Sequence, residues 1–295
     1  MTHIPVMTKE VLENLNLKAG SFVLDCTLGT AGHALEILKR IGPHGRYIGT
    51  DRDGESLSVA QDRLKDFAGQ CHFEQTDFRD FDVVLNKLGI REVDAILLDV
   101  GISSYQIDNP QRGFSLRSDG PLDMRMDKNS YISAYDLVNS LSEKEIASIL
   151  KNFGEERWHH RIASFLVRER SKNPIASTGD LSRVVLRAIP RGAGKQKIHP
   201  ATRTFQAFRI AVNRELEALE VALDKSINYL KVGGRTCVIS FHSLEDRIAK
   251  EKFKEFSQKG LGRIITKTPL RPSDEENAVN SRARSARLRV IERTK

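Results

Sequence analysis

The stretch from Ser21 to His33 constrains the fold of this chain more than any other. Its first half, Phe22-Val23-Leu24, is a short apolar run that ends in Asp25, as in a buried parallel strand. Small residues follow, and apolar positions 34, 35, 37, 38 and 41 then recur with helical spacing. The order of strand, glycine turn and helix predicts the first unit of a nucleotide-binding α/β sheet, in which the helix N-terminus offers unpaired N–H groups to a ligand.

A second strand is predicted at 46–50, and it ends in Asp51. A carboxylate about 20 residues after the glycine turn can accept hydrogen bonds from both hydroxyls of a ribose. The turn contains Gly29 and Gly32 but not the full G-x-G-x-x-G pattern, and Asp25 beside it would repel a pyrophosphate. A positively charged nucleoside without phosphate suits these charges, and S-adenosyl-L-methionine is such a ligand. The alternative is an ordinary strand end with surface acids.

Composition narrows the class of protein. The 295 residues carry a formal net charge of +8, which favours a polyanionic partner. Three widely separated cysteines, Cys26, Cys71 and Cys237, form no C-x-x-C pair and no disulfide framework, so a cytoplasmic location is expected. No signal peptide opens the sequence and no apolar run approaches the ~20 residues that span a bilayer, so no membrane association is expected. The spacing of His and Cys predicts no metal site.

The α/β rhythm continues with strands expected at 71–76 and 93–99 and helices at 55–67 and 81–88. From Tyr105 onward the rhythm stops. A turn-rich, charged run comes first, then helices are expected at 134–140, 142–153, 156–170 and 180–188, followed by a basic loop at 191–197. A long helix from His199 to about Leu230, strands at 236–240 and 285–293, and a helix after Phe241 complete the pattern.

We therefore predict an α/β protein with a doubly wound, Rossmann-like sheet formed by residues 1–104 and 199–295. Residues 105–198 are predicted to be an all-helical insertion that recognises the substrate. In open α/β sheets, ligands bind at the carboxyl ends of the strands. The fourth strand ends in Asp99, and the polar side chains of Ser103, Ser104 and Gln106 follow it. At the end of the third strand, Asp77-Phe78 could hold the edge and face of an adenine, although Phe78 fits a core position nearly as well.

With these stretches in hand, the chain resembles the bacterial 16S ribosomal RNA cytosine-N4 methyltransferases, the RsmH or MraW family. The resemblance covers almost the whole length. The matching blocks are Asp25-Cys-Thr-Leu-Gly-Thr-Ala-Gly-His33, Asp51-Arg-Asp53, Leu97-Leu-Asp-Val-Gly-Ile-Ser-Ser-Tyr-Gln-Ile-Asp108, Arg112-Gly-Phe-Ser115, Asp119-Gly-Pro-Leu-Asp-Met-Arg-Met-Asp127, Gly154-Glu-Glu-Arg157, His199-Pro-Ala-Thr-Arg-Thr-Phe-Gln206 and Ile239-Ser-Phe-His-Ser-Leu-Glu-Asp-Arg247.

The resemblance implies an S-adenosylmethionine-dependent methyltransferase that acts on small-subunit ribosomal RNA, within a ribosomal particle. A homodimer is left open. It also implies which positions contact the cofactor: Ala31, Gly32, His33, Asp51, Phe78, Asp99 and Gln106. The chain departs from the family at two places. Ala31 stands where many members have glycine, which a negative φ would tolerate, and Tyr105 stands where proline is common.

The residues also bear on the mechanism. Methylation of a ring carbon needs a cysteine nucleophile, and none of the three cysteines suits that role. An exocyclic amine needs orientation and hydrogen-bond acceptors instead. We expect the amine to attack the methyl group directly, without a covalent enzyme–base intermediate. Asp99, Ser103 and Ser104 are the candidate catalytic acceptors, while Asp99 could instead serve the cofactor or be a strand end without reactant contact.

The candidate RNA contacts are Arg112, Arg125, His199, Arg203 and Arg209. Arginine forks suit phosphate, and Lys195, Lys197 and the basic C-terminal segment 259–295 add positive charge. For any one of these arginines, a solvated or ion-paired surface position is an equally good interpretation. Met124 and Met126 could line a base pocket, although core packing is their commoner use.

Three other functions agree with parts of the sequence. A dinucleotide-dependent oxidoreductase would explain the glycine turn and Asp51, but the phosphate fingerprint is incomplete. An RNA-binding module that keeps the fold without the activity would show a damaged cofactor site, and the motifs here are intact. The third is methylation of another base amine, such as that of adenine. The composition does not exclude it, and only the resemblance to the family disfavours it.

Overall fold

The computed structural model describes residues 5–190 and 198–295, and the chain divides into two compact units. The sheet unit consists of Met1–Gly101 and Leu216–Lys295, and the helical unit consists of Ile102–Glu215. The basic loop expected at 191–197, with Lys195 and Lys197, lies outside the described residues. No helix among the residues described is long and apolar enough to cross a membrane.

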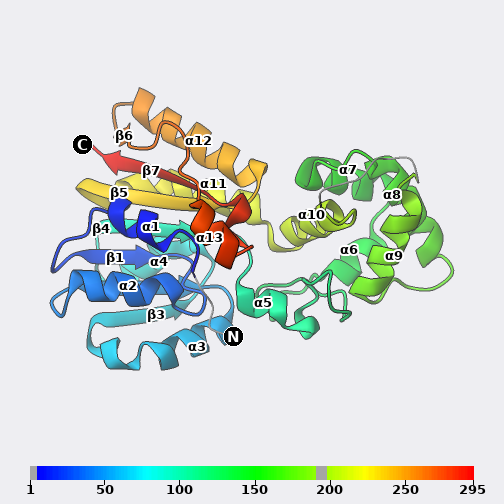
Figure 1. Ribbon diagram of the computed structural model, residues 1–295, viewed down its shortest axis with the longest axis horizontal. Coiled ribbons are helices and arrows are strands. Elements are labelled where there is room, and N and C mark those ends of the chain that lie inside the picture. Colours follow the sequence, from blue (N-terminus) through cyan, green and yellow to red (C-terminus); the bar gives the residue numbers. More distant parts are fainter. Residues whose placement is uncertain (1–4, 191–197) are drawn as a thin grey trace. The chain divides into compact units, whose positions relative to one another are not determined.

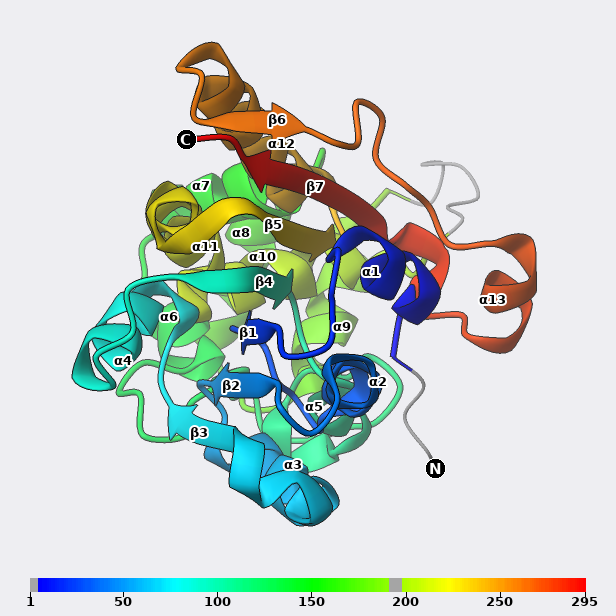
Figure 2. The ribbon, with the colours of Figure 1, turned by 90° about the vertical axis from the view of Figure 1, so that its left-hand side faces the viewer.

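The sheet unit contains a seven-stranded sheet in the order β3-β2-β1-β4-β5-β7-β6. In Figure 2 this order runs from β3 at the bottom to β6 at the top. The strands are β1 (Phe22–Asp25), β2 (Arg46–Asp51), β3 (Cys71–Gln75), β4 (Val93–Asp99), β5 (Leu230–Ser240), β6 (Gly262–Ile264) and β7 (Arg287–Arg293). Strands β1 to β5 are parallel to one another, while β7 runs antiparallel to both β5 and β6. The order turns back at β1 and β4, which is the switch point of a doubly wound sheet.

Helices cover both faces of this sheet (Figure 1). One face packs against α1 (Thr8–Asn14), α2 (Gly32–Ile41) and α3 (Gly54–Arg63), and the other against α4 (Phe81–Lys87), α11 (Glu215–Ser226) and α12 (Ser243–Gln258). Along β4, Ala95 and Leu97 enter the first of these cores, and Ile96 and Leu98 enter the second. A strand that is buried on both faces reads as a continuous apolar run, which is why the sequence predicted it clearly.

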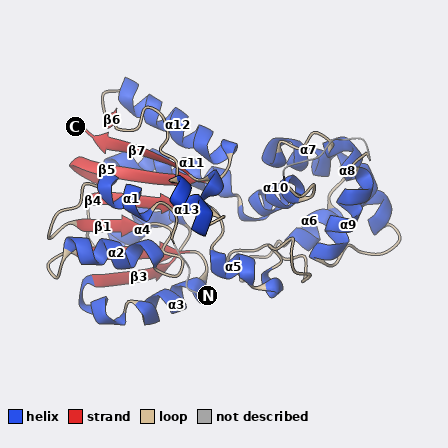
Figure 3. Ribbon diagram, in the orientation of Figure 1, coloured by secondary structure: helices blue, strands red, loops and turns tan. Residues whose placement is uncertain are grey.

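The helical unit is built from helices joined by loops (Figure 3). Its helices are α5 (Ser104–Asp108), α6 (Ala134–Ser140), α7 (Glu143–Gly154), α8 (His159–Arg170), α9 (Thr178–Ala188) and α10 (Thr202–Asn213). They enclose their own apolar core, into which the turn-rich run contributes Phe114, Leu122, Met124 and Met126. The two methionines are therefore core residues and do not line a base pocket.

The long helix expected from His199 to about Leu230 is wrong. The structure has two helices, α10 and α11, because Arg214 between them adopts a left-handed conformation with φ of 50°. The amide of Asn213 fixes the end of α10 by donating to the carbonyl of Met124 and accepting from the N–H of Met126, both at 2.8 Å. Because α10 packs with α7, the boundary between the units falls after 215 and not at 198.

Short elements account for most other differences from the expected pattern. Strand β5 begins at Leu230, earlier than the expected 236, because Leu230 pairs with Val93 before an irregularity in the register. Strand β6 and helix α13 (Asp274–Val279) lie between the helix expected after Phe241 and the strand expected at 285–293, where the sequence pattern predicted no regular element. Elements of three to six residues are too short to show a period of their own.

Candidate functional site

Three carboxyl groups end adjacent strands of the sheet unit at the same edge. Asp25 ends β1, Asp51 ends β2 and Asp99 ends β4, and β1 pairs in parallel with both of the other strands. The carboxyl ends of parallel strands at a switch point form the usual ligand edge of such sheets. The three carboxyl groups therefore lie at one edge of the sheet.

Asp51 supports the glycine turn from the neighbouring strand. One carboxylate oxygen accepts the N–H of Gly29 at 2.7 Å and the other accepts the N–H of Asp53 at 2.8 Å. Burial raises the pKa of Asp51 to about 6, against the opposing effect of these two N–H groups. Each oxygen of a carboxylate has a further lone pair, so Asp51 can still accept from the hydroxyls of a ribose.

The turn after β1 leads into the N-terminus of α2. Ala31 is the N-cap residue, and no side chain caps the first turn. Its φ is 64°, so the negative φ that would tolerate the methyl group is not present. This chain holds an alanine in the left-handed region, where glycine costs nothing and other residues cost about 1–2 kcal/mol. An uncapped helix N-terminus beginning with Gly32 and His33 suits the carboxylate of an amino-acid group.

His33 and Asp99 carry buried polar atoms that none of the described residues satisfies. The Nε2 atom of His33 lies 3.6 Å from Oδ2 of Asp99, and His33 is only 6% exposed. Three of these atoms form no hydrogen bond with the residues that the structure describes: both ring nitrogens of His33 and Oδ1 of Asp99. Buried polar groups in proteins are normally paired, so three orphaned atoms together fit a polar ligand that sits against them.

Asp25 has a different role from the one expected. It is 1% exposed, and its two oxygens accept from the hydroxyl of Tyr47 at 2.6 Å and from the N–H of Thr27 at 3.0 Å. Burial raises the pKa of Asp25 above its ordinary value. The carboxyl therefore holds the turn together and does not face a ligand, and the argument from its charge toward a cationic nucleoside is not supported.

Sequence reasoning missed Thr27 and Tyr47, which position the strand ends. The hydroxyl of Thr27 accepts the N–H of Asp99 at 2.7 Å and so ties the turn after β1 to the end of β4. The spacing of Asp25 and Thr27 is that of an Asx-turn, a signal that the sequence contained. Tyr47 gave no such signal, because its hydroxyl reaches a residue on another strand.

Asp77 and Phe78 follow the end of β3, and the structure supports only part of the role predicted for Phe78. Asp77 beside it is occupied by two arginines: Oδ2 lies 3.1 Å from Arg79 and 3.3 Å from Arg52. Phe78 is partly buried and packs against the apolar core formed with α4, α11 and α12. Its packing fits the core alternative and leaves part of the ring accessible.

The helical unit holds the other predicted residues that follow β4. Ser103 and Gln106 form a capping box at the start of α5, in which the Ser103 hydroxyl accepts the N–H of Gln106 at 3.2 Å and the Gln106 side chain accepts the N–H of Ser103 at 3.1 Å. Ser104 and Gln106 are buried, at 8% and 3% exposure. The capping box gives Ser103 and Gln106 a structural role that the sequence analysis did not foresee.

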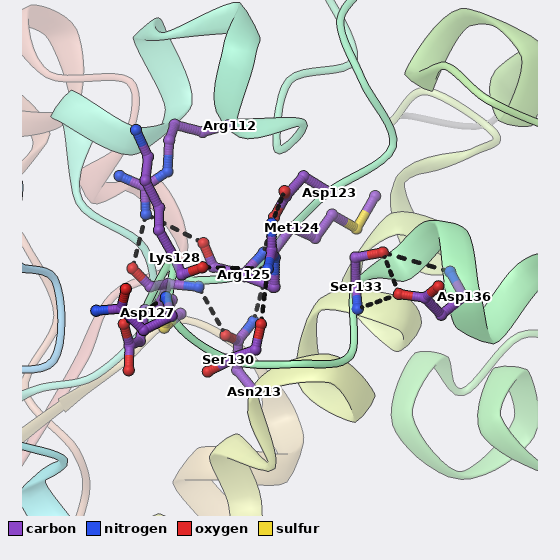
Figure 4. A network of polar contacts seen from close by, with 12 residues as sticks. Arg112, Asp123, Met124, Arg125, Asp127, Lys128, Ser130, Ser133, Asp136 and Asn213 are labelled. Carbon is purple, nitrogen blue, oxygen red and sulfur yellow. Dashed lines mark hydrogen bonds and ion pairs between the residues drawn. The ribbon is translucent and has the colours of Figure 1, made fainter.

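Arg112 is a buried structural residue and not a phosphate contact. It is 1% exposed and donates to the backbone carbonyls of Arg125 and Met126, at 3.0 and 2.7 Å. Figure 4 shows this network, in which Arg125 binds the Asp123 carboxylate and donates to the carbonyls of Lys128 and Ser130. Together the two arginines fasten the turn-rich run, which explains how a segment without regular structure stays ordered.

The three candidate RNA contacts in and near α10 differ in how far their side chains are exposed to solvent. Arg209 makes two hydrogen bonds to the Glu215 carboxylate, at 2.9 and 2.8 Å, so it is the ion-paired case that the sequence analysis left open. Arg203 is exposed and donates to the carbonyl of Glu155 at 3.2 Å. His199 is exposed, and its Nδ1 accepts the N–H of Ala201 at 3.2 Å. Only His199 and Arg203 present their side chains to solvent.

The cysteines are poor nucleophiles. Cys26 and Cys237 are buried, and burial raises the pKa of both thiols well above the ordinary value. Partial burial raises the pKa of Cys71 to about 11. The thiolate is the reactive form, so none of the three is poised for attack at neutral pH.

This arrangement was compared with known proteins. A family model described as the MraW methylase family matches residues 1–294. The chain belongs to this family. The "Ribosomal RNA small subunit methyltransferase H" of Clostridium botulinum (strain Kyoto / Type A2) is 45% identical to it, over 98% of this chain and 97% of its own length. The protein of the same name from Geotalea uraniireducens (strain Rf4) is 47% identical, over 99% and 98%.

Membership of the MraW methylase family confirms the resemblance and excludes the oxidoreductase alternative. The doubly wound sheet is that of a Rossmann-like methyltransferase, and S-adenosyl-L-methionine is its cofactor, as the sequence predicted. The orphaned atoms of His33 and Asp99, the carboxylate of Asp51 and the uncapped start of α2 fit that molecule, which combines an amino acid with a nucleoside.

Proposed function

We propose that this protein transfers a methyl group from S-adenosyl-L-methionine to the N4 amine of a cytidine in small-subunit (16S) ribosomal RNA. The observation that carries the proposal is the match to the MraW methylase family over residues 1–294, together with full-length relatives named as small-subunit ribosomal RNA methyltransferases. The proposal includes a substrate presented in a ribosomal particle and a cytoplasmic location.

The proposed cofactor contacts follow the edge of the sheet. Gly32 and His33 at the start of α2 would hold the amino-acid end, Asp51 the ribose hydroxyls and the accessible part of Phe78 the adenine. We also assign Ala31 and Gln106 to this site, on the basis of the family. When bound, the cofactor supplies an electrophilic methyl group.

The proposed chemistry is direct attack by the amine, with Asp99 as the hydrogen-bond acceptor that orients it. Asp99 Oδ1 is buried and accepts no hydrogen bond from the described residues, so it has a lone pair to offer an N–H group. Ser103 is a weaker candidate because its hydroxyl caps α5, and Ser104 is buried. The raised thiol pKa values support a reaction without a covalent enzyme–base intermediate.

The helical unit is the proposed site of RNA contact. Residues 102–215 contain 19 Lys and Arg against 12 Asp and Glu, a net charge of +7, whereas the sheet unit has 28 against 27, a net charge of +1. A polyanion is drawn to the unit that carries the excess. Among the sequence candidates we retain His199 and Arg203, which are exposed. We drop Arg112, which is buried, and Arg125 and Arg209, whose guanidinium groups are ion-paired.

The test is to map methylated nucleosides in small-subunit ribosomal RNA from cells with and without the protein. We expect one cytidine to lose its N4-methyl group, and purified protein with S-adenosyl-L-methionine to restore it on particles from the deficient cells. Calorimetry with NAD in place of the cofactor serves as the negative control. A methyl group lost from adenine or from a ring carbon would contradict the proposal.

A further inference from the structure

Helix α8 and the two residues that precede it carry alternating arginines and aromatic rings along one face, with Trp158 as the N-cap residue and Arg157 just before it. The residues are Arg157, Trp158, Arg161, Phe165 and Arg168, which we call the α8 stripe. Positions three and four apart lie one above another on a helix. The opposite face, with Ile162, Ala163 and Leu166, is buried in the core of the helical unit. The stripe is thus on the outer side of the helix, where the three arginines are exposed.

The arginines of the stripe rest on the rings and not on acids. The guanidinium carbon of Arg157 lies 5.1 Å from the ring centre of Trp158, and those of Arg161 and Arg168 lie 5.3 and 4.4 Å from the ring centre of Phe165. Among the described residues, none of the three pairs with a carboxylate. Cation–π contact holds a guanidinium in place without neutralising it.

The neighbouring helix shows what a compensated surface looks like. On α9, Arg183 pairs with Asp180, and Arg187 lies 3.1 Å from Glu169. The side chains of Arg183 and Arg187 are 65% and 57% exposed, so exposure alone does not set the stripe apart. The difference is that the stripe keeps three full charges on one face of a unit whose net charge is +7.

We infer that the α8 stripe binds the phosphodiester backbone of the RNA substrate, an inference that rests on the proposed function. A guanidinium stacked on a ring is pre-organised and keeps N–H groups for phosphate. Arg161 also donates from Nε to the backbone carbonyl of Ala188, so it would offer phosphate its terminal N–H groups. Trp158 and Phe165 are only partly buried and offer apolar surface to a base or sugar beside the phosphate. Single-stranded RNA can use both parts of the stripe, because its phosphates pair with the arginines and its bases stack on the rings. An acidic protein surface would use only the positive charges, so the stripe suits RNA better.

The experiment uses the full chain with Arg157→Gln and Arg168→Gln combined. Neither side chain makes an ion pair among the described residues, so folding and binding of S-adenosyl-L-methionine should match the wild type. The control combines Arg183→Gln with Arg187→Gln, which removes the same two charges from ion-paired arginines of the same unit. The probe is the small ribosomal particle isolated from cells that lack the protein.

We expect the stripe variant to bind the particle roughly tenfold more weakly at moderate salt. The slope of log affinity against log salt should fall in magnitude by about 1.4, since each contact with single-stranded RNA contributes about 0.7. KM for methylation should rise while kcat stays unchanged. The control variant should keep the wild-type slope. In a Phe165→Leu variant, which retains apolar bulk, affinity should drop with the slope preserved.

Two results would overturn the inference. A stripe variant with wild-type affinity and slope would show that the face does not touch RNA. A weaker affinity with an unchanged slope would indicate a protein partner in the particle. Both results leave the proposed function intact as long as the wild-type protein methylates the particle, and absence of that methylation would contradict the proposed function itself.

Discussion

His33 and Asp99 meet at the carboxyl edge of the sheet, with 3.6 Å between Nε2 of the imidazole and Oδ2 of the carboxylate. The distance is longer than a hydrogen bond, and both side chains keep polar atoms that no described residue satisfies. Leaving such atoms buried and unpaired costs about 1–3 kcal/mol each. The pair is therefore poised for a ligand, and the cost would be relieved when S-adenosyl-L-methionine binds.

Replacing Asp99 should damage both binding and catalysis. In Asp99→Ala we expect weaker binding of S-adenosyl-L-methionine and a methyl-transfer rate lower by on the order of 100-fold, because a hydrogen-bond acceptor at the reacting centre is lost. Calorimetry measures the first effect and single-turnover kinetics the second. Asp62→Ala, on the exposed side of α3, is the control. An Asp99→Ala variant with wild-type turnover would remove Asp99 from the mechanism.

Cofactor affinity should depend on pH through Asp51. The carboxyl accepts from ribose hydroxyls best when ionised, and its pKa is raised to about 6. Affinity should therefore be highest at pH 7.5 and fall as the pH drops through 6, by up to about tenfold at pH 5. Asp51→Asn should bind more weakly at pH 7.5 and lose the dependence, and Asp51→Ala should lose roughly 1.5–3 kcal/mol of binding. A pH dependence that persists in Asp51→Asn would point to another group.

None of the cysteines should be needed for methyl transfer. Cys26→Ala, Cys71→Ala and Cys237→Ala should each retain most of the activity per folded molecule, because burial keeps these thiols protonated. RNA that carries 5-fluorocytidine at the target should not trap the enzyme, since trapping requires a thiolate adduct with the ring. Denaturing gel electrophoresis detects such an adduct, and its isolation would refute direct attack.

Arg112 should matter for stability. Arg112→Met removes the donors to two backbone carbonyls inside the helical unit, which we expect to cost about 2–4 kcal/mol of unfolding free energy. Arg117→Met, an exposed neighbour in the sequence, should change stability by less than about 0.5 kcal/mol. Chemical denaturation and hydrogen exchange over 102–215 provide the comparison. Equal stability of the two variants would mean that Arg112 is not a structural residue.

Glycine at position 155 should stabilise the helical unit. Glu155 ends α7 in a left-handed conformation with φ of 47°, and its N–H and that of Glu156 both donate to the carbonyl of Leu150. Glycine adopts this conformation without strain, so Glu155→Gly should raise the unfolding free energy by about 1 kcal/mol. Glu155→Ala keeps the strain and should show no gain. Thermal unfolding of both variants tests this, and equal midpoints would contradict it.

The sequence alone predicts most strands of the sheet and the residues at its carboxyl edge. Strands β1 and β4 are apolar runs ending in aspartate, β2 also ends in aspartate, and that pattern depends only on residues next to each other along the chain. Asp51 and Asp99 could be named for the same reason, because the position of a residue at the end of a strand follows from the strand itself. Gly32 and His33 were named from the resemblance to the family.

Tertiary structure decided which polar side chains are available to a ligand. Arg112 and Arg209 look alike in the sequence, yet one is buried against carbonyls at 125 and 126 and the other is paired with Glu215. Asp25 turned out to be occupied by Tyr47, on another strand. The α8 stripe was equally invisible, since an arginine keeps its charge only where folding brings no acid to it. Pairing of this kind depends on residues that are distant in the chain, so the spacing of neighbouring residues cannot predict it.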